Sequence, residues 1–548
     1  MTAELSQQAR QALHQLPQWL QSGRHVEAAA ALRRALDTAP GDPALAPALQ
    51  QAAVLARAWL ASGRHIEALA FLAPIAESEH AGRTLWMLYG HALMAVGRKV
   101  EAEAVFRRWK EKEPASGEAA LRLAAVLADG GKPMEAERIV REQVARSGDT
   151  PEAAFVLGRA LLGLSRFDEA ETAFRKVVHA RPEHQQAQAN LMELVWMRSG
   201  DVHDASRPID RALRARPNLA GLRITKARLL MSARRPREAL EVIDEGLALA
   251  ANDPALLKAA STIALETDAA RALDYAERLL RVAPNDSSAR VEFGNASLAS
   301  GRAQAALETA EALHRLNPAD GRAIAMKADA LRMLGDPRYR ELLDYRGLVR
   351  ADPIDVPDGW QNLDAYVADL VADLGRLHTL RAHPIGNSLR EGSQIPLNPA
   401  ESPFASIRAF PEAIDGPIRR YLHALGSGAD PMRRRNTGHY RLSGIWSVRL
   451  RPHGYHVNHY HPEGWISSAC YLQLPPAVAR RGGEGWLKFG EPAFPTRPPL
   501  GPEYFVRPEP GLLALFPSYM WHGTVPFSGG PGDTRLTMAF DVVPTRTE

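Results

Sequence analysis

The stretch SRFDEAETAFRKVVHARPEH, residues 165–184, decides the fold of the first part of the chain. It places a turn-forming residue at Ser165, an alanine five positions later at Ala170 and a proline seventeen positions later at Pro182. Matching turn positions recur every 33 to 35 residues after a first step of 40: Gly23, Gly63, Gly97, Gly131, Ser165, Gly200, Arg234, Thr267, Gly301 and Gly335. A fixed period of this length indicates a helical repeat array.

The recurring alanine and proline predict how each unit folds. An alanine follows the first nine turn positions by five residues: Ala28, Ala68, Ala102, Ala136, Ala170, Ala205, Ala239, Ala272 and Ala306. Its methyl group lets the backbones of two neighbouring helices approach closely. Six units also carry the proline, which ends the second helix because the residue before it is excluded from helical geometry: Pro40, Pro114, Pro182, Pro217, Pro284 and Pro318.

This pattern resembles the tetratricopeptide repeat, a pair of helices in about 34 residues. We expect a repeat array over residues 7–340, with about nine to ten units. Stacked repeats of this kind form an extended groove. The resemblance therefore implies that a protein or peptide partner binds in the repeat groove.

The chain changes character after residue 340. We expect a linker over residues 341–360, which contains two prolines in ADPIDVPDGW, and a second domain over residues 361–548. Two amphipathic helices are predicted there, at 362–380 and 404–425. Short alternating segments bounded by Gly or Pro predict antiparallel strands at 444–450, 466–474, 485–490, 511–517 and 535–543.

The predicted fold class is therefore multidomain α + β. An N-terminal all-α solenoid is followed by a C-terminal jelly-roll domain, also called a double-stranded β-helix, with flanking helices.

Composition excludes several classes of protein. The net charge is only +4 and the charges are interspersed, so we expect no nucleic-acid partner in spite of a pI near 9.1. No stretch approaches the roughly 20 apolar residues that span a bilayer, so no membrane association is expected. The single cysteine, Cys470, excludes an intrachain disulfide and a zinc site built on several thiolates. The first residues lack the features of a secretory signal, and we expect a cytoplasmic protein.

The segment GYHVNHYHPEGWISSACYLQLP, residues 454–475, carries a concentration of histidines. Together with His453, it places His456, His459 and His461 within nine residues, directly before an alternating apolar run. Residues two apart in an extended chain point the same way. His459 and His461 therefore share a face, whereas a regular strand would turn His456 to the opposite one. Because His522 is the only histidine after His461, it is the candidate for a third metal ligand.

The last 190 residues are similar to the 2-oxoglutarate- and Fe(II)-dependent oxygenases that are found fused behind tetratricopeptide repeats. The similarity rests on GIWSVRLRPHGYHVNHYHPEGWISSACYLQLP at 444–475, on GLLALFPSYMWHGTVPF at 511–527 and on RLTMAFDVVP at 535–544. It implies Fe(II) as the metal, with 2-oxoglutarate and O2 as co-substrates. It also implies that His459, His461 and His522 are metal-site residues and that Arg535 binds the far carboxylate of 2-oxoglutarate. A guanidinium suits this carboxylate because it can bond it through two parallel hydrogen bonds.

The ligand set departs from the usual His-x-Asp/Glu pair, because His461 stands two positions after His459. Three arrangements are open. In the first, three histidines bind the iron. In the second, His461 and Glu463 form the His-x-Glu ligand pair and His459 lies behind them without binding the metal. In the third, one histidine serves only as a hydrogen-bond donor and the other two are ligands. We favour the first, because Pro462 would interrupt the extended geometry that His461 and Glu463 need to converge.

Further residues are candidates for the surroundings of the site. Trp446 and Tyr471 could line the pocket or belong to the core, and His456 could lie near the metal. Asn458 and Ser468 could hydrogen-bond the ligand side chains. Arg535 could alternatively form an ion pair with an aspartate, either Asp533 or Asp541.

The functional hypothesis is an Fe(II)- and 2-oxoglutarate-dependent dioxygenase that hydroxylates a peptide or protein recruited by the repeats. One alternative is a repeat-based interaction scaffold whose jelly roll is not catalytic. Another is a cupin-like metalloenzyme that does not use 2-oxoglutarate.

Overall fold

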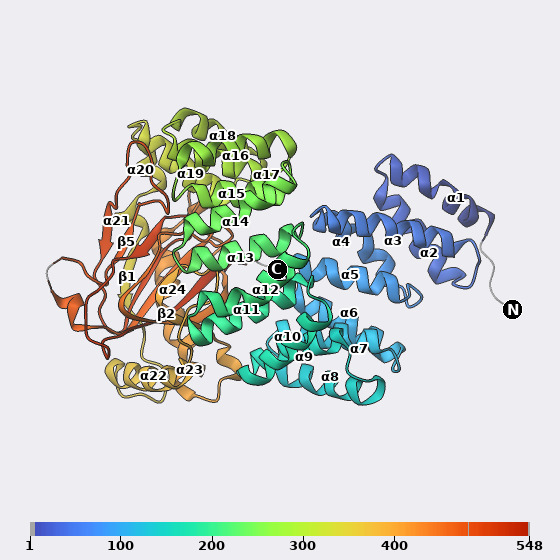
Figure 1. Ribbon diagram of the computed structural model, residues 1–548, viewed down its shortest axis with the longest axis horizontal. Helices are drawn as coiled ribbons and strands as arrows, with labels where there is room; N and C mark the ends of the chain where they lie inside the picture. Colours follow the sequence, from blue (N-terminus) through green and yellow to red (C-terminus); the bar gives the residue numbers. More distant parts are fainter. Residues whose placement is uncertain (1–5, 481, 546–548) are drawn as a thin grey trace. The chain divides into compact units, whose positions relative to one another are not determined.

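The computed structural model describes residues 6–480 and 482–545, and the chain divides into two compact units, Met1–Ala187 and Gln188–Glu548. Figure 1 shows helices in the blue and green part of the chain and strands in the orange and red part. The helices that lie within the first unit are α1 (Gln7–Gln21), α2 (His25–Thr38), α3 (Leu45–Ala61), α4 (His65–Ala76), α5 (Arg83–Ala95), α6 (Lys99–Lys112), α7 (Gly117–Asp129), α8 (Pro133–Ser147), α9 (Pro151–Gly163) and α10 (Phe167–Ala180).

The second unit continues with helices of the same kind. They are α11 (Gln185–Ser199), which begins at the boundary, α12 (Val202–Ala215), α13 (Ala220–Ser232), α14 (Pro236–Leu249), α15 (Pro254–Ala264), α16 (Ala269–Val282), α17 (Ser287–Ala299), α18 (Ala303–Leu316) and α19 (Gly321–Met333).

The recurring residues behave as the period predicts. All nine repeat alanines are 0% exposed, because each lies in the contact between paired helices. Nine of the ten turn positions adopt a positive φ, and Ser165 (57°) and Arg234 (60°) do so without being glycine. The exception is Thr267. Each helix that precedes one of the six repeat prolines ends two residues before it, as α10 ends at Ala180 before Pro182.

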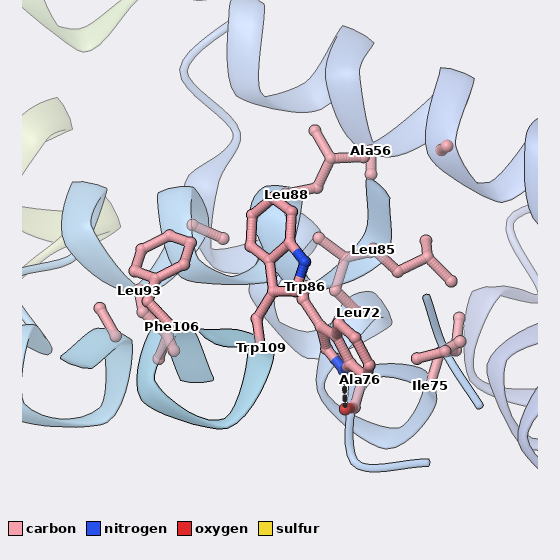
Figure 2. Packing of buried hydrophobic residues seen from close by; sticks show 14 of the residues in the cluster. Ala56, Leu72, Ile75, Ala76, Leu85, Trp86, Leu88, Leu93, Phe106 and Trp109 are labelled. Carbon is pink, nitrogen blue, oxygen red and sulfur yellow. Dashed lines mark hydrogen bonds between the residues drawn. The ribbon is translucent and has the colours of Figure 1, made fainter. Parts of the chain in front are cut away.

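Within the first unit the helix pairs bury one continuous apolar core, part of which is shown in Figure 2. Trp86 and Trp109 lie in this core, and the indole nitrogen of Trp86 donates a hydrogen bond to the carbonyl of Ala76 at 3.2 Å. In the last pair of this unit, Gly158 of α9 lets the ring of Phe174 approach, since a Cβ there would lie 2.6 Å from the ring. Small residues thus set the spacing of the helices, as the sequence pattern indicates.

The remaining elements of the second unit form a region of antiparallel sheets with flanking helices. The helices are α20 (Tyr339–Leu342), α21 (Tyr345–Leu348), α22 (Leu363–Leu377), α23 (Ala405–Arg408) and α24 (Phe410–Leu425), with short 3-10 turns at Pro399–Glu401, Arg433–Arg435 and Pro476–Ala479. The strands are β1 (Arg350–Pro353), β2 (Leu389–Pro396), β3 (Tyr440–His456), β4 (Ile466–Gln473), β5 (Leu487–Phe489), β6 (Tyr504–Val506), β7 (Leu512–Pro517), β8 (His522–Thr524) and β9 (Arg535–Pro544).

These strands form two sheets. The larger has the order β1-β7-β4-β9-β3-β2 and the smaller has the order β6-β5-β8, with antiparallel pairs throughout. An isolated bridge between His459 and His522 extends the smaller sheet past β8. Because the chain passes back and forth between the two sheets, the topology favours the predicted jelly-roll class. The predicted succession of a helical repeat region and an antiparallel sheet region is confirmed.

An apolar layer joins the two sheets, and helices cover the larger one. The rings of Phe489 in β5 and Phe516 in β7 meet edge to face at 5.0 Å. On α24, Phe410 packs against Phe540 of β9 with ring centroids 6.0 Å apart. The two predicted amphipathic helices correspond to α22 and to the α23–α24 pair.

Residues 341–360, predicted as a linker, include α21 and the strand β1. β1 pairs with β7 at the edge of the larger sheet, in a register that matches Arg350 with Leu515. An edge strand tolerates the proline at its end, Pro353, because that residue has no N–H to donate. A proline-rich stretch can therefore be part of the sheet. The division of the chain at residues 340 and 361 stays a prediction based on the type of element.

Within the second unit, odd-numbered repeat helices contact the sheet region directly. On α11, the indole of Trp196 donates to the carbonyl of His383 at 2.8 Å. Gly386 donates through its N–H to Ser232 of α13 at 3.0 Å. At the start of α19, the N–H of Gly321 donates to the carbonyl of Pro462 at 3.1 Å. These helices hold the sheet region in place, so they are not free along their whole length for a separate partner.

Among the described helices, none combines the length and the apolar character that a bilayer crossing requires.

Candidate metal centre

Three histidines converge where the smaller sheet meets the segment after β3. Their candidate ligand atoms all lie within 4.8 Å of one another, and the ring centroids are 4.2 Å (His459–His522), 5.3 Å (His459–His461) and 5.4 Å (His461–His522) apart. Two backbone hydrogen bonds of 2.9 Å, from each N–H to the other carbonyl, join His459 to His522. The backbone pairing of two distant segments therefore places the imidazoles together.

Hydrogen bonds fix the orientation of each ring. Nδ1 of His459 lies 2.8 Å from the carbonyl of Val457, and Nδ1 of His522 lies 2.9 Å from the carbonyl of Met520. Since a carbonyl oxygen can only accept, Nδ1 carries the proton in both rings. Each Nε2 then keeps its lone pair, and among the described residues it has no hydrogen-bond partner. This is the tautomer that binds a metal through Nε2.

The third ring is oriented by a carboxylate. Nδ1 of His461 lies 2.7 and 2.8 Å from the two carboxylate oxygens of Asp541 in β9. Ser467 of β4 donates to the same carboxylate at 2.7 Å, and its hydroxyl lies 2.9 Å from that of Ser518. A carboxylate behind a ligating imidazole fixes the ring and raises its basicity. The role of Asp541 is not visible in the sequence, because 80 residues separate it from His461.

Burial favours the neutral form of two of the three imidazoles, His459 and His522. Desolvation, and then the charge of His461, lower the pKa of His459 to about 3. Burial likewise lowers the pKa of His522 well below its usual value. Neutral imidazole is the form that coordinates a metal, so these rings are available to one at neutral pH.

A cavity of about 640 Å³ opens beside the three histidines, within the size range of small-molecule sites. Arg535, at the start of β9, lines this cavity and is only 2% exposed. Its Nε donates to the carbonyl of Gly485 at 3.2 Å, and its guanidinium lies over the ring of Tyr471 at 5.0 Å. Burial lowers the pKa of Arg535, but guanidinium stays charged at neutral pH.

Arg535 has no carboxylate partner among the described residues. Asp541 is engaged with His461, and Asp533 accepts a hydrogen bond from the N–H of Gly530. The alternative of an ion pair with either aspartate is therefore not what the structure contains. A buried cation without a carboxylate partner is costly, and its position in a cavity is typical of an anion-binding site.

Two predicted pocket residues, Trp446 and His456, line this cavity. The ring of Trp446 lies 6.0 Å from that of His461. The ring of His456 lies 5.9 Å from that of His459, and its Nδ1 lies 2.9 Å from the hydroxyl of Ser388, so His456 does not take the opposite face that a regular strand would give it. β3 ends at His456, so the alternation of a regular strand does not extend to His459.

The remaining candidates do not bond the histidine side chains. Asn458 donates from its side chain to the carbonyl of Pro492 at 3.1 Å. Ser468 exchanges hydrogen bonds of 2.8 Å with the backbone of Phe540 and so joins β4 to β9. Glu463, the alternative ligand, is exposed at the cavity lining and lies outside the cluster of three histidines.

The donor set fits Fe(II). Imidazole nitrogen is a suitable ligand for iron, so His459, His461 and His522 would hold it beside the cavity. The one cysteine of the chain, Cys470, is buried in β4 and is not part of the cluster.

The repeat helix α19 contacts a residue next to one of the metal-site histidines. Trp521, directly before His522, donates from its indole to the carboxylate of Asp329 in α19 at 2.7 Å. Tyr460, between His459 and His461, packs edge to face on Trp521 with ring centroids 4.5 Å apart. The residues next to the histidines thus anchor them to a repeat that lies about 190 residues earlier in the chain.

Asp541→Ala is expected to weaken metal binding about 10- to 100-fold, because it removes the carboxylate that orients His461. Competition with a chromophoric chelator measures the dissociation constant for Co(II) or Fe(II). The matched control is Asp533→Ala, a carboxylate just before β9 that does not contact the histidines. Equal metal affinities of the two variants would contradict this role for Asp541.

Asp329 is expected to make stability depend on pH. Burial raises its pKa to about 7, above the unfolded value near 4, so the folded chain holds a proton that the unfolded chain releases between these values. The unfolding free energy should fall as pH rises through this window, by up to about 1.4 kcal/mol per pH unit. Asp329→Asn, which resembles the protonated form, should remove this dependence. Calorimetry from pH 4 to pH 8 measures it.

The control for this prediction is Asp336→Asn, on the turn after the same helix. A hydrogen bond from Arg338 lowers the pKa of Asp336, so its replacement should not produce the same trend. If the wild type and Asp329→Asn show parallel pH profiles, Asp329 is ionised in the folded protein at all these pH values.

Comparison with known families matches both parts of the chain. Residues 444–541 match the family described as "Putative 2OG-Fe(II) oxygenase", and residues 121–185 and 155–220 match the tetratricopeptide repeat. The chain thus contains a tetratricopeptide repeat region and a domain of this oxygenase family, as the sequence resemblance indicates. No match was found among curated proteins.

Solved structures similar to the chain include two that are described as tetratricopeptide repeat proteins. One from Parabacteroides merdae is 15% identical with a TM-score of 0.35, covering 47% of this chain and 99% of that chain. A thermophilic one from Thermus thermophilus is 22% identical with a TM-score of 0.27, covering 33% and 100%. Pseudomonas aeruginosa pilF is 20% identical with a TM-score of 0.27, covering 38% and 93%.

Proposed function

We propose that the protein is an Fe(II)- and 2-oxoglutarate-dependent dioxygenase that hydroxylates a peptide or protein substrate. The observation that carries this proposal is the combination, in one cavity, of three imidazoles with free Nε2 atoms and one buried guanidinium that has no carboxylate partner among the described residues. A metal site alone would not require Arg535, and an anion site alone would not require three preoriented histidines.

His459, His461 and His522 would hold the iron, which supplies the site for O2 reduction when it is bound. The reaction consumes one O2, one 2-oxoglutarate and one C–H bond, and yields succinate, CO2 and an alcohol. O2 accepts four electrons, two from the oxidative decarboxylation and two from the C–H bond. One oxygen atom enters succinate and the other enters the product.

The protein groups have defined tasks in this scheme. Arg535 binds the far carboxylate of 2-oxoglutarate through a charge-assisted pair and so directs its keto acid end toward the histidines. Asp541 and Ser467 fix the orientation of the His461 ring.

The repeats are the proposed recruitment surface for a protein partner. Because α11, α13 and α19 contact the sheet region, we place this surface on the first unit, α1 to α10, which is a complete series of helix pairs.

The test of the proposed function is stoichiometric turnover. Purified protein with Fe(II), 2-oxoglutarate and O2 should release succinate in a 1:1 ratio to O2 consumed, slowly without substrate. The double variant His459→Ala/His522→Ala should release none. Succinate release that does not depend on these histidines would refute the assignment, as would an Fe(II)-loaded wild type that releases none.

A further inference from the structure

A second guanidinium, that of Arg390, lies in the same cavity as Arg535. Ser388 and Arg390 line the cavity, and Leu389 between them is buried in a small apolar cluster with Val448 and Leu450. Arg390 thus belongs to the same cavity lining as His456, His459 and Arg535.

The Arg390 guanidinium is fixed along one edge and free along the other. Its Nη1 donates two hydrogen bonds of 2.8 Å, to the carbonyls of Asn387 and Leu389. Among the described residues, neither Nε nor Nη2 has a hydrogen-bond partner, and no carboxylate lies within ion-pair distance. Because the side chain is already held in place, it loses little conformational entropy when a ligand binds its free edge.

The surrounding charges do not neutralise Arg390. Glu266, after α15, attracts it and Arg234, after α13, repels it, but neither is bonded to it. Arg234 instead lies over the ring of Tyr455, 5.8 Å from its centroid. Burial lowers the pKa of Arg390, which is the sign of an incompletely solvated cation.

The cavity as a whole has one cation more than the proposed co-substrate requires. Of the described residues that line it, two are acidic, and Asp541 is engaged with His461 while Glu463 is exposed. In the proposed function, one carboxylate of 2-oxoglutarate binds Arg535 and the other end of the molecule binds the iron. Arg390 is left without an anion.

We propose that Arg390 is a specificity-determining residue that binds a carboxylate of the substrate, namely an Asp or Glu side chain of a peptide. This inference rests on the proposed function and specifies its substrate class. One free guanidinium edge offers two parallel N–H donors, which match the two oxygens of a carboxylate. A phosphate has three acceptor oxygens and nearly two charges, and a single edge leaves it undersatisfied.

The experiment uses the full chain loaded with Co(II), which is paramagnetic, and two blocked probe peptides, acetyl-Gly-Asp-Gly-amide and acetyl-Gly-Asn-Gly-amide. Broadening of the peptide proton signals by Co(II) reports binding near the metal without any turnover. In the presence of 2-oxoglutarate, the Asp peptide should bind at least tenfold more tightly than the Asn peptide. Arg390→Gln should remove this difference, and Arg390→Lys should restore part of it.

Binding of 2-oxoglutarate, measured by calorimetry on the same samples, separates the two proposals. Arg390→Gln should leave this affinity within about twofold of the wild type. Equal binding of the two peptides by the wild type would overturn the carboxylate site, and so would a large loss of 2-oxoglutarate affinity in Arg390→Gln, which would make Arg390 a co-substrate residue. Failure of the wild type to bind 2-oxoglutarate would refute the proposed function instead, whatever the peptides do.

Discussion

His522→Ala is expected to abolish metal binding at micromolar concentrations, with a loss of affinity of at least about 100-fold. Replacing a group behind a ligand already costs 10- to 100-fold, and His522 is itself one of three candidate ligands, 6% exposed and fixed by its Nδ1 hydrogen bond. Chelator competition with Fe(II) under anaerobic conditions measures the affinity. His439→Ala is the control, because His439 is an exposed histidine outside the cluster.

The same titration distinguishes the first two ligand arrangements. If three histidines hold the metal, His459→Ala and His461→Ala should lose affinity as His522→Ala does, and Glu463→Gln should not. If His461 and Glu463 form the pair, Glu463→Gln should lose affinity and His459→Ala should largely keep it. A folded His522→Ala variant with wild-type affinity would contradict both arrangements.

Arg535→Gln is expected to raise the dissociation constant for 2-oxoglutarate at least tenfold. It removes a charge-assisted hydrogen-bonded pair worth about 1.5–3 kcal/mol, and about 1.4 kcal/mol corresponds to a factor of ten. Fe(II) affinity should hardly change, because Arg535 is not one of the clustered ligands. Calorimetric titration of the metal-loaded protein with 2-oxoglutarate measures the effect.

Arg390→Gln is the matched control for this variant, since both arginines line one cavity and neither has a carboxylate partner among the described residues. Comparing the 2-oxoglutarate affinities of the two variants should therefore show which arginine binds the co-substrate. Unchanged 2-oxoglutarate affinity in Arg535→Gln would remove the co-substrate assignment and favour a cupin-like metal site that does not use 2-oxoglutarate.

The repeat array was predictable because its signal is local and periodic. A buried alanine such as Ala170 and a left-handed turn residue such as Ser165 each follow from steric demands within one helix pair. The strands β3, β4, β7 and β9 were predictable for a similar reason, since alternation over six or more residues is visible in the sequence, whereas β2, with eight residues, was not predicted. β6 and β8 have three residues each, too few to show a period.

The surroundings of the metal site were less predictable, because they depend on register between distant strands. Ser467 of β4 is paired with Asp541 of β9, and this pairing places the carboxylate behind His461. The contact of Asp329 with Trp521 joins residues 192 positions apart. Sequence spacing indicated which imidazoles share a face, but it could not supply either of these tertiary contacts.

The central claim is that one metal at the three histidines binds 2-oxoglutarate directly. Anaerobic titration with Fe(II) and 2-oxoglutarate tests it, because chelation of Fe(II) by a keto acid produces a charge-transfer absorption in the visible range. We expect this absorption to reach its end point at one Fe(II) and one 2-oxoglutarate per chain, and to be absent in His522→Ala. An Fe(II)-loaded wild type that develops no such absorption at saturating 2-oxoglutarate would contradict the account.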